Sequence, residues 1–268
     1  MPEQQTPKGE TRNSVLDEMG FLEHLTELRQ RLVRAVVAAF LGMLACYAFA
    51  KTLFDWLMLP LFRALPEKSS MIYTAPHEAF FTYLKVAFVA GIFLTSPYIF
   101  YQIWLFIRPG LYTHERKYIM PISFCSALLF VVGSLFGYFV VFPYAYKFFM
   151  GFSDVYISPM ITMREGFSFA LRLLIAFGIV FEQPLVIFFL ARLGLVTPAG
   201  LRTKRKYAIL CGFLVSAILT PPDVFTQTFM AGPLILLYEI GIWIAVLVGR
   251  TKEKPAEEPA NAQDDSAA

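Results

Sequence analysis

The stretch LRLLIAFGIVFEQPLVIFFLARL, Leu171–Leu193, consists mostly of apolar residues and holds one carboxylate, Glu182, near its middle. Together with the residues just before it, from position 167, it is long enough to cross the roughly 30 Å hydrocarbon core of a bilayer as a helix. A carboxylate at that depth costs roughly 2.5–3.5 kcal/mol on insertion-based scales and marks a functional site by default. The stretch therefore predicts a membrane-spanning helix with a polar site inside it.

The two residues after the carboxylate enlarge this polar site. Gln183 adds a side-chain amide, and Pro184 has no backbone N–H to donate. The proline therefore leaves the carbonyl of Val180 without its helical partner. One turn of one helix thus carries a carboxylate, an amide and a freed carbonyl, and we expect a polar partner to meet it.

The composition places the whole chain in the membrane. Of 268 residues, 57% are hydrophobic and 16% are charged, whereas soluble domains average roughly 45–50% and 25%. The three cysteines are odd in number and show no CxxC spacing, which indicates neither a disulfide framework nor a metal site. The first thirty residues are polar and charged, which excludes a cleavable signal peptide. We expect a polytopic membrane protein.

The apolar runs predict an all-α fold with six transmembrane helices in a single domain over residues 18–250. Disordered cytoplasmic tails are expected at 1–17 and 251–268. The predicted spans lie at about 32–50, 78–101, 118–141, 167–193, 207–220 and 225–249. The two outer loops, about 51–77 and 142–166, are long enough to form a cap. Lys and Arg gather in the segments that place both termini in the cytoplasm.

The fifth and sixth spans are predicted to be short. Only about 14 residues separate Lys206 from Pro221, roughly 21 Å of helix, and the sixth span is interrupted at Gly232 and Pro233. A short span is either buried among its neighbours or locally thins the bilayer.

An amphipathic helix is predicted before the first span, over residues 18–34. Its apolar stripe is made of residues that recur at helical spacing: Phe21, Leu22, Leu25, Leu28 and Leu32. Such a helix is expected to lie at the inner membrane interface.

The sequence lacks the motifs of most enzyme classes. It contains no Walker loop, dinucleotide fingerprint, HExxH or GxSxG element, and its three histidines are scattered over different loops. A membrane protease, a metalloenzyme and a nucleotide hydrolase are therefore not indicated, and we expect no enzyme activity, no cofactor and no nucleic-acid partner. Any work must draw on binding energy or on the membrane potential.

The loop after the second span, YQIWLFIRPGLYTHERKY at 101–118, is unusually aromatic. An interfacial aromatic belt with Arg116 and Lys117 as topology signals explains most of it. It does not explain Glu115, an acid where positive charge is favoured. A carboxylate beside aromatic rings suits a cationic peptide, because arginine pairs bidentately with carboxylates and stacks on rings.

Five segments, in order along the chain, resemble the TatC family, the core receptor subunit of the twin-arginine protein translocase. They are FLEHLTELRQRL at 21–32, the aromatic loop at 101–118, FVVFP at 139–143, FGIVFEQP at 177–184 and LTPPDVFTQ at 219–227. The resemblance implies a receptor in the bacterial cytoplasmic (inner) membrane for folded proteins whose signal peptides carry paired arginines. It also implies a multimeric complex with single-span TatA-like and TatB-like subunits, driven by the protonmotive force.

The resemblance also assigns roles by position. Signal-peptide binding is implied for Glu27, Glu115, Phe106 and Arg29, with Glu23 as an additional acid and Arg108 as an additional cation in the loop. Polar, partner-docking positions in the membrane are implied for Glu182, Gln183 and Gln227, and structural roles for Pro60, Pro184 and Asp223.

Other interpretations of these residues remain open. Glu27 stands four residues before Arg31, the favoured order for an intrahelical ion pair worth roughly 0.2–0.5 kcal/mol. The chain could also be a small ion- or proton-coupled secondary transporter that uses its intramembrane charges, Glu182, Glu239, Lys85 and Arg172. Transporters usually show internal repeats with paired broken helices, and none is evident. A third possibility is a structural assembly factor.

Overall fold

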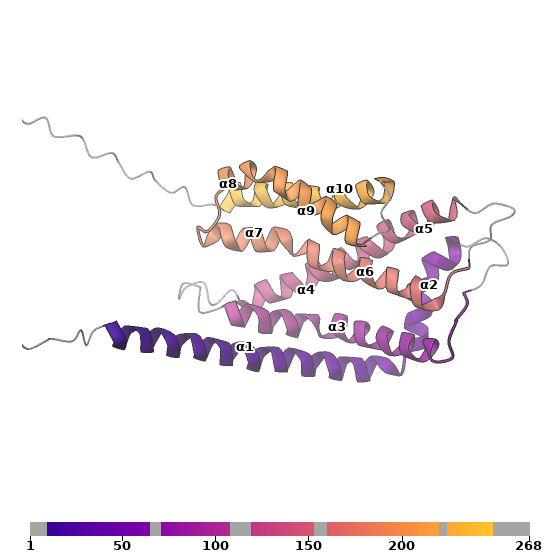
Figure 1. Cartoon of the computed structure of the whole chain (residues 1–268), viewed down its shortest axis with the longest axis horizontal. Coiled ribbons are helices and arrows are strands. Elements are labelled where there is room, and N and C mark those ends of the chain that lie inside the picture. The colour runs from indigo at the N-terminus through magenta and orange to yellow at the C-terminus, as the bar shows by residue number, and fades with distance from the viewer. Residues whose placement is uncertain (1–9, 65–70, 108–118, 153–159, 220–223, 249–268) are drawn as a thin grey trace, which may run out of the picture.

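The computed structural model describes residues 10–64, 71–107, 119–152, 160–219 and 224–248, with side chains from residue 23 onward, and its named elements are all helical. In chain order they are α1 (Glu10–Tyr47), α2 (Ala50–Ala64), α3 (Glu78–Ile107), α4 (Ile119–Phe136), the π-helix η3 (Gly137–Val141), α5 (Phe142–Met150), α6 (Met163–Phe181), α7 (Gln183–Arg192), α8 (Pro198–Thr203), α9 (Arg205–Leu219) and α10 (Val224–Val248) (Figure 1).

Five stretches of the described residues are long and apolar enough to cross a membrane: 23–47, 78–107, 119–150, 163–192 and 224–248. They coincide with the first four predicted spans and the sixth, so the all-α polytopic fold is confirmed. The predicted fifth span is helix α9, which has 15 residues and a length of roughly 22 Å. The count of six spans rests on α9 and stays a prediction.

The helix predicted over 18–34 is part of α1, which runs without a break from Glu10 to Tyr47; no glycine or proline stands between positions 20 and 42 to interrupt it. One detail of the predicted helices is wrong. The sixth span is not short, because α10 continues for 25 residues through Pro233. A proline is tolerated inside such a helix where neighbouring groups satisfy the freed carbonyl.

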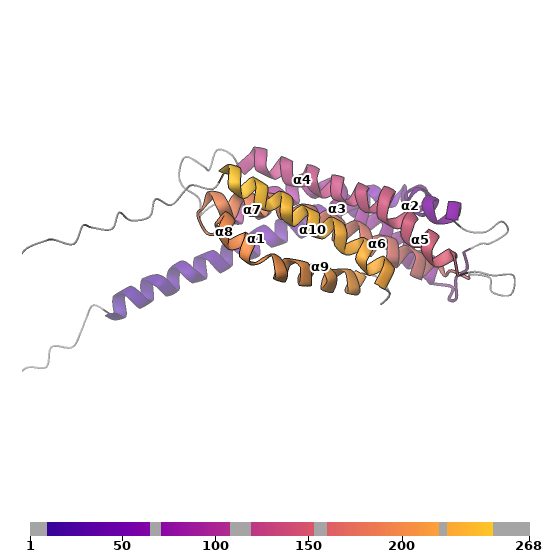
Figure 2. The same ribbon diagram turned by 90° about the horizontal axis from the view of Figure 1, so that it is seen from above.

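The helices form an elongated bundle with distinct ends (Figures 1 and 2). The N-terminal end of α1 and the C-terminal end of α10 lie at the same end, which we call the terminal end; α2, α5 and the beginnings of α3 and α6 lie at the other, which we call the loop end. Helix α1 packs along α3, α4 along α6, and α10 along α7 and α9. Gly42 and Gly91 allow α1 and α3 to approach closely, since a Cβ on Gly91 would lie 2.3 Å from the Met43 nitrogen.

At the loop end, residues 71–78 and 160–166 are joined by backbone and side-chain bonds. Ile72 pairs with Thr162 in an isolated parallel bridge, in which the Met163 N–H donates to the Ile72 carbonyl over 2.8 Å. The Glu78 carboxylate accepts from the N–H and hydroxyl of Thr74 and, over 2.7 Å, from the N–H of Arg164. This junction fixes the start of α3 against the start of α6.

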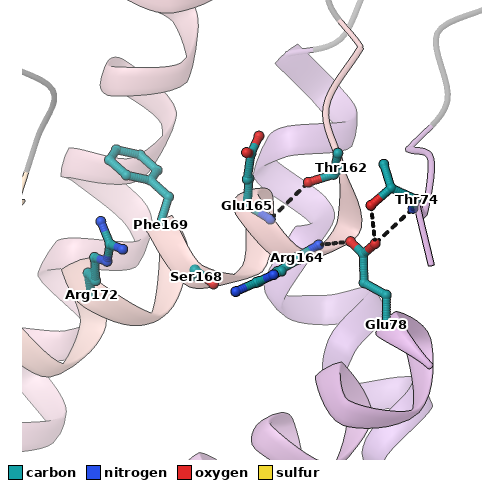
Figure 3. A pocket seen from close by; sticks show the side chains of 8 residues that line it. All are labelled: Thr74, Glu78, Thr162, Arg164, Glu165, Ser168, Phe169 and Arg172. Atoms are coloured by element: carbon teal, nitrogen blue, oxygen red, sulfur yellow. Dashed lines mark hydrogen bonds between the residues drawn. The ribbon is translucent and has the colours of Figure 1, made fainter. Parts of the chain in front are cut away.

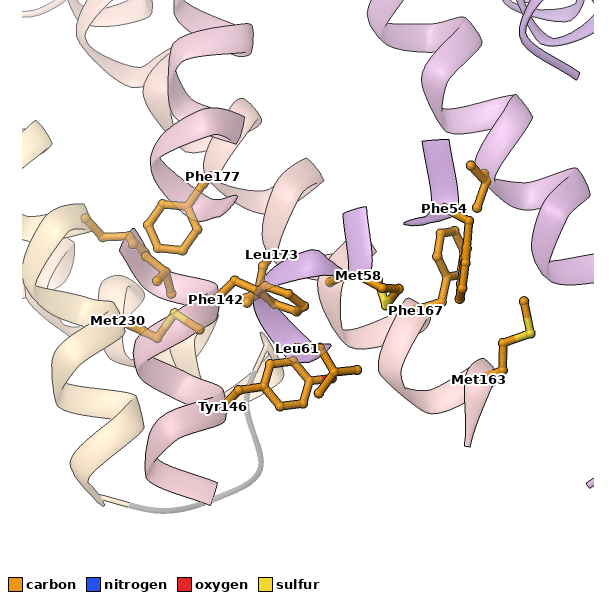
Figure 4. Close-up of a cluster of buried hydrophobic side chains, with 14 residues drawn as sticks. Phe54, Met58, Leu61, Phe142, Tyr146, Met163, Phe167, Leu173, Phe177 and Met230 are labelled. Atoms are coloured by element: carbon orange, nitrogen blue, oxygen red, sulfur yellow. The ribbon is translucent and has the colours of Figure 1, made fainter. Parts of the chain in front are cut away.

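The largest buried cluster lies where α2, α5 and α6 meet (Figure 4). Helix α2 contributes Phe54, Met58 and Leu61, whose spacing of four and three residues puts them on one helical face. Phe142 and Phe167 are among the fully buried side chains that receive this face. The cluster anchors helix α2 against the loop end of the bundle. Pro60 lies inside this helix.

Candidate functional site

The first candidate site lies at the terminal end, where the first residues of α1 whose side chains are described meet the end of α3. The His24 ring stacks on the Phe106 ring, with centroids 4.4 Å apart and an interplanar angle of 17°. Glu27 stands just under one helical turn after His24, so its carboxylate lies on the part of α1 that borders the end of α3. We call this group, His24, Glu27, Arg31 and Phe106, the Glu27 surface.

The Glu27 carboxylate is held by its own helix. Arg31 donates to Oε1 through Nε over 2.9 Å and through Nη2, and the His24 Nδ1 lies 4.0 Å from Oε2. The intrahelical ion pair considered from the sequence is therefore present. The Glu27 side chain remains 33% exposed and that of Arg31 17%. A second guanidinium can reach this carboxylate and compete with Arg31 for it.

Of the other residues predicted for signal-peptide binding, some lie on α1 and the rest lie outside the described residues. Glu23 and Arg29 are exposed on α1. Glu115 and Arg108 lie outside the described residues, in the segment 108–118 that follows α3. The structure thus brings Phe106 and Glu27 to one surface and leaves the prediction for Glu115 untested.

The second candidate site is the break in the helix that contains Glu182. Helix α6 ends at Phe181 and α7 begins at Gln183, with Pro184 in the first turn of α7. The sequence predicted one span that lacks a backbone donor at Pro184, and the structure divides that span into two helices at Glu182. Within the described residues, Oε1 of Glu182 is buried and has no hydrogen-bond partner. Gln183 is half-buried beside it. A buried acceptor without a donor is costly, which sets this oxygen apart from most other buried side-chain polar atoms of the described residues.

Two further residues support Glu182, and sequence reasoning missed this arrangement. The Trp104 indole N–H donates to the Ser126 hydroxyl over 2.8 Å, and Ser126, which is fully buried, lies next to the Glu182 carboxyl group. Trp104 also packs edge-on against Phe189 of α7. It is 5% exposed, so it is not part of an exposed aromatic belt. The feature of the sequence that could have revealed this arrangement is Ser126, a polar residue inside an apolar helix.

Gln227 and Glu239 serve contacts within the chain. The Gln227 amide donates to the Phe213 carbonyl over 3.1 Å and ties α10 to α9. Glu239, considered from the sequence as a second intramembrane carboxylate, accepts from Arg205 Nη2 over 2.6 Å. Asp223 lies outside the described residues. The secondary-transporter alternative relies on two intramembrane carboxylates, Glu182 and Glu239. One of them, Glu239, is already paired with an arginine.

Comparisons with known proteins agree on one family. The family model described as Sec-independent protein translocase protein (TatC) matches residues 23–233. The Sec-independent protein translocase protein TatC of Desulforapulum autotrophicum is 49% identical over 91% of this chain and 90% of its own length. That of Escherichia coli K12 is 39% identical over 90% of this chain and 95% of its own.

A solved structure supports the same assignment. The crystal structure of a twin-arginine translocase receptor, TatC, superposes with a TM-score of 0.76 and 41% identity, covering 85% of this chain and all of that one. The all-helical fold, the family model, the relatives and the solved structure all indicate the same family. The chain is a multi-pass membrane protein and a non-enzymatic component of a protein translocase that works with other Tat subunits, and it belongs to the TatC family.

Proposed function

We propose that this chain is the receptor of a twin-arginine translocase, which binds the paired-arginine signal peptides of folded proteins and organises TatA-like and TatB-like single-span subunits into a multimeric complex. The observation that carries the proposal is the Glu27 surface. It combines a one-third exposed carboxylate with a stacked pair of rings, His24 and Phe106, at one end of the bundle. The similar protein of known structure is a twin-arginine translocase receptor, which supports the same function for this chain.

The chemistry of the Glu27 surface suits an arginine pair. A guanidinium forms two parallel hydrogen bonds to a carboxylate and also stacks on a ring face. One arginine of the signal peptide takes Glu27 from Arg31, while its neighbour meets the acid of the adjoining loop, Glu115. Glu23 and Arg29, exposed on α1, border the path of the peptide.

The orientation belongs to the same proposal. Because the N-terminal end of α1 and the C-terminal end of α10 lie together (Figure 1), one assignment covers both termini. The bias of Lys and Arg toward that end favours the cytoplasmic side of a bacterial inner membrane. The Glu27 surface then faces the cytoplasm, where signal peptides arrive, and the loop end faces outward.

Glu182 has a different role in this proposal. The half-buried Glu182 side chain, one oxygen of which has no hydrogen-bond partner within the described residues, accepts a hydrogen bond from a polar side chain on the transmembrane helix of a partner subunit. Gln183 extends the polar surface on the same turn. The protonmotive force, which the resemblance to the TatC family implies, supplies the energy for the transport step.

Photocrosslinking of a twin-arginine signal peptide tests the receptor role. In membranes that contain the full complex, Glu27→Gln should lower the yield of crosslink at least tenfold, because a neutral amide loses the charge-assisted pair. Asp55→Asn, which removes an exposed acid on α2 at the loop end, is the control and should leave the yield unchanged. Equal yields from both variants would overturn the assignment of Glu27.

The transporter alternative has its own measurement. The purified chain in liposomes, with a proton gradient imposed, should take up no solute by itself. Ion-coupled uptake by this subunit alone, lost in Glu182→Gln, would favour the transporter.

A further inference from the structure

Two cavities flank the junction at the loop end, one on each side of Glu78. The larger, about 590 Å³, is lined by Thr162, Arg164, Glu165, Ser168, Phe169 and Arg172 (Figure 3). The smaller, about 290 Å³, is lined by residues that include His77, Phe81 and Lys85. Both share Thr74, Glu78 and Arg164. They therefore form two halves of one polar depression around the bonded carboxylate.

Three cations line this depression, and none has an ion pair within the described residues: Lys85, Arg164 and Arg172. All three are exposed. Lys85 stands seven residues after the start of α3 and Arg172 nine residues after the start of α6. These steps are roughly 10 and 13 Å along the helix axes, so both charges lie inside spanning helices near one boundary of the bilayer. A cation at that depth needs an anionic partner or water.

The acids nearby leave a net positive charge. The Glu78 carboxylate is engaged by three donors of the junction, and Figure 3 shows the Glu165 side chain directed away from that of Arg164. Three cations against two carboxylates give a formal charge of +1, with His77 neutral. A single negative charge completes this balance. The hydroxyls of Ser168 and Thr162, which line the larger cavity, add hydrogen-bond donors.

We propose that this depression binds the phosphodiester of a phospholipid headgroup. A phosphodiester carries one negative charge and accepts several hydrogen bonds, and arginine guanidinium matches its oxygens bidentately. The position favours a lipid over free phosphate, because the site lies where two spanning helices begin. The apolar rings of Phe81 and Phe169 line its two cavities and offer contact to the glycerol and upper acyl carbons. The bound lipid would bridge α3 and α6 beside the junction.

Native mass spectrometry of the purified full chain in detergent tests this site with phosphatidylglycerol as the probe. The wild type should retain one phosphatidylglycerol. Arg164→Gln/Arg172→Gln should weaken its retention at least tenfold, whereas Arg164→Lys/Arg172→Lys should keep most of it. Lys51→Gln/Lys147→Gln removes two exposed cations that line neither cavity and should behave as the wild type. Equal retention by all four proteins would overturn the proposal.

Two further probes separate the sources of the phosphate. Diacylglycerol, which has the chains but no phosphate, should not be retained, and excess inorganic phosphate should not displace phosphatidylglycerol. Displacement by inorganic phosphate would make the site one for a free anion and overturn the lipid assignment. If the double glutamine variant melts earlier than the wild type, Lys85→Gln becomes the deciding variant, since this exposed side chain takes no part in the junction; unchanged retention in it would count against the site.

Discussion

At the residue scale, Glu182 is set apart by a buried carboxylate oxygen that receives no hydrogen bond within the described residues. Ser126 of α4, which accepts a hydrogen bond from Trp104, lies beside the carboxyl group. An acceptor without a partner is what the docking role proposed for Glu182 requires.

Ser126→Ala tests the support of Glu182. The change removes a buried hydroxyl next to a carboxyl group and should cost roughly 1–3 kcal/mol at that site, so crosslinking of partner subunits to a probe at the exposed position Val186, one turn after Glu182, should fall about tenfold. Signal-peptide crosslinking should persist. Ser123→Ala is the matched control, because Ser123 is also buried on α4 but donates only to its own helix, at the Ile119 carbonyl. An equal loss in both variants would mean a general effect on α4.

The ion pair between Arg31 and Glu27 leads to a second prediction at this scale. If Arg31 competes with incoming arginines for Glu27, then Arg31→Gln should tighten the binding of a twin-arginine signal peptide by about twofold, the equivalent of an intrahelical pair worth roughly 0.2–0.5 kcal/mol. Titration of a labelled peptide in nanodiscs measures the change. Arg34→Gln, an exposed position one turn further along α1, should not alter the affinity. Weaker binding in Arg31→Gln would instead make Arg31 a part of the peptide site.

At the element scale, the pairing of α1 with α3 decides whether the Glu27 surface exists. The two helices approach at Gly42 and Gly91, where a Cβ on Gly42 would lie 2.7 Å from the Gly91 carbonyl oxygen. Far along the same pair, His24 reaches Phe106. The close approach in the middle of the pair and the ring stack at its end therefore depend on one another.

Gly91→Ala should force α1 away from α3, because the added carbon would lie 2.3 Å from the Met43 nitrogen. Overpacking of this kind costs roughly 1–3 kcal/mol, which should lower the melting temperature in detergent by several degrees and weaken signal-peptide binding. Gly232→Ala in α10 provides the contrast. Nothing lies within 4 Å of its added carbon, and alanine favours the helix by roughly 0.5–1 kcal/mol. A melting temperature unchanged in Gly91→Ala would contradict the contact.

At the scale of the whole molecule, the junction at the loop end joins segments more than eighty residues apart. Glu78→Ala should release both, because it leaves the N–H groups of Thr74 and Arg164 without their acceptor in two part-buried hydrogen bonds, each worth roughly 0.5–1.5 kcal/mol. Limited proteolysis of inverted vesicles and of spheroplasts should show faster cleavage at the loop end only. Glu165→Ala, at an exposed acid in the first turn of α6, is the control and should cleave at the wild-type rate.

Much of the fold and part of the site follow from local patterns. Hydropathy over 20 or more residues located five spanning stretches, because the bilayer sets helix length directly. The proline after Glu182 predicted the loss of one helical hydrogen bond within one turn, and the structure shows a break between α6 and α7 at that place. Pro233 carries the same local signal, yet α10 continues through it. Whether a helix bends or breaks at a proline depends on the groups packed around it.

The sequence by itself determined that the protein is helical and membrane-spanning, which family it resembles and that Glu182 is exceptional, because residue type, spacing and hydropathy act over short distances. Only the tertiary structure decided that Ser126 and Trp104 support Glu182, that Glu239 is paired with Arg205, and that three cations gather around Glu78. These contacts join helices far apart in the chain, and they follow from how close two helices can approach, which no single segment specifies.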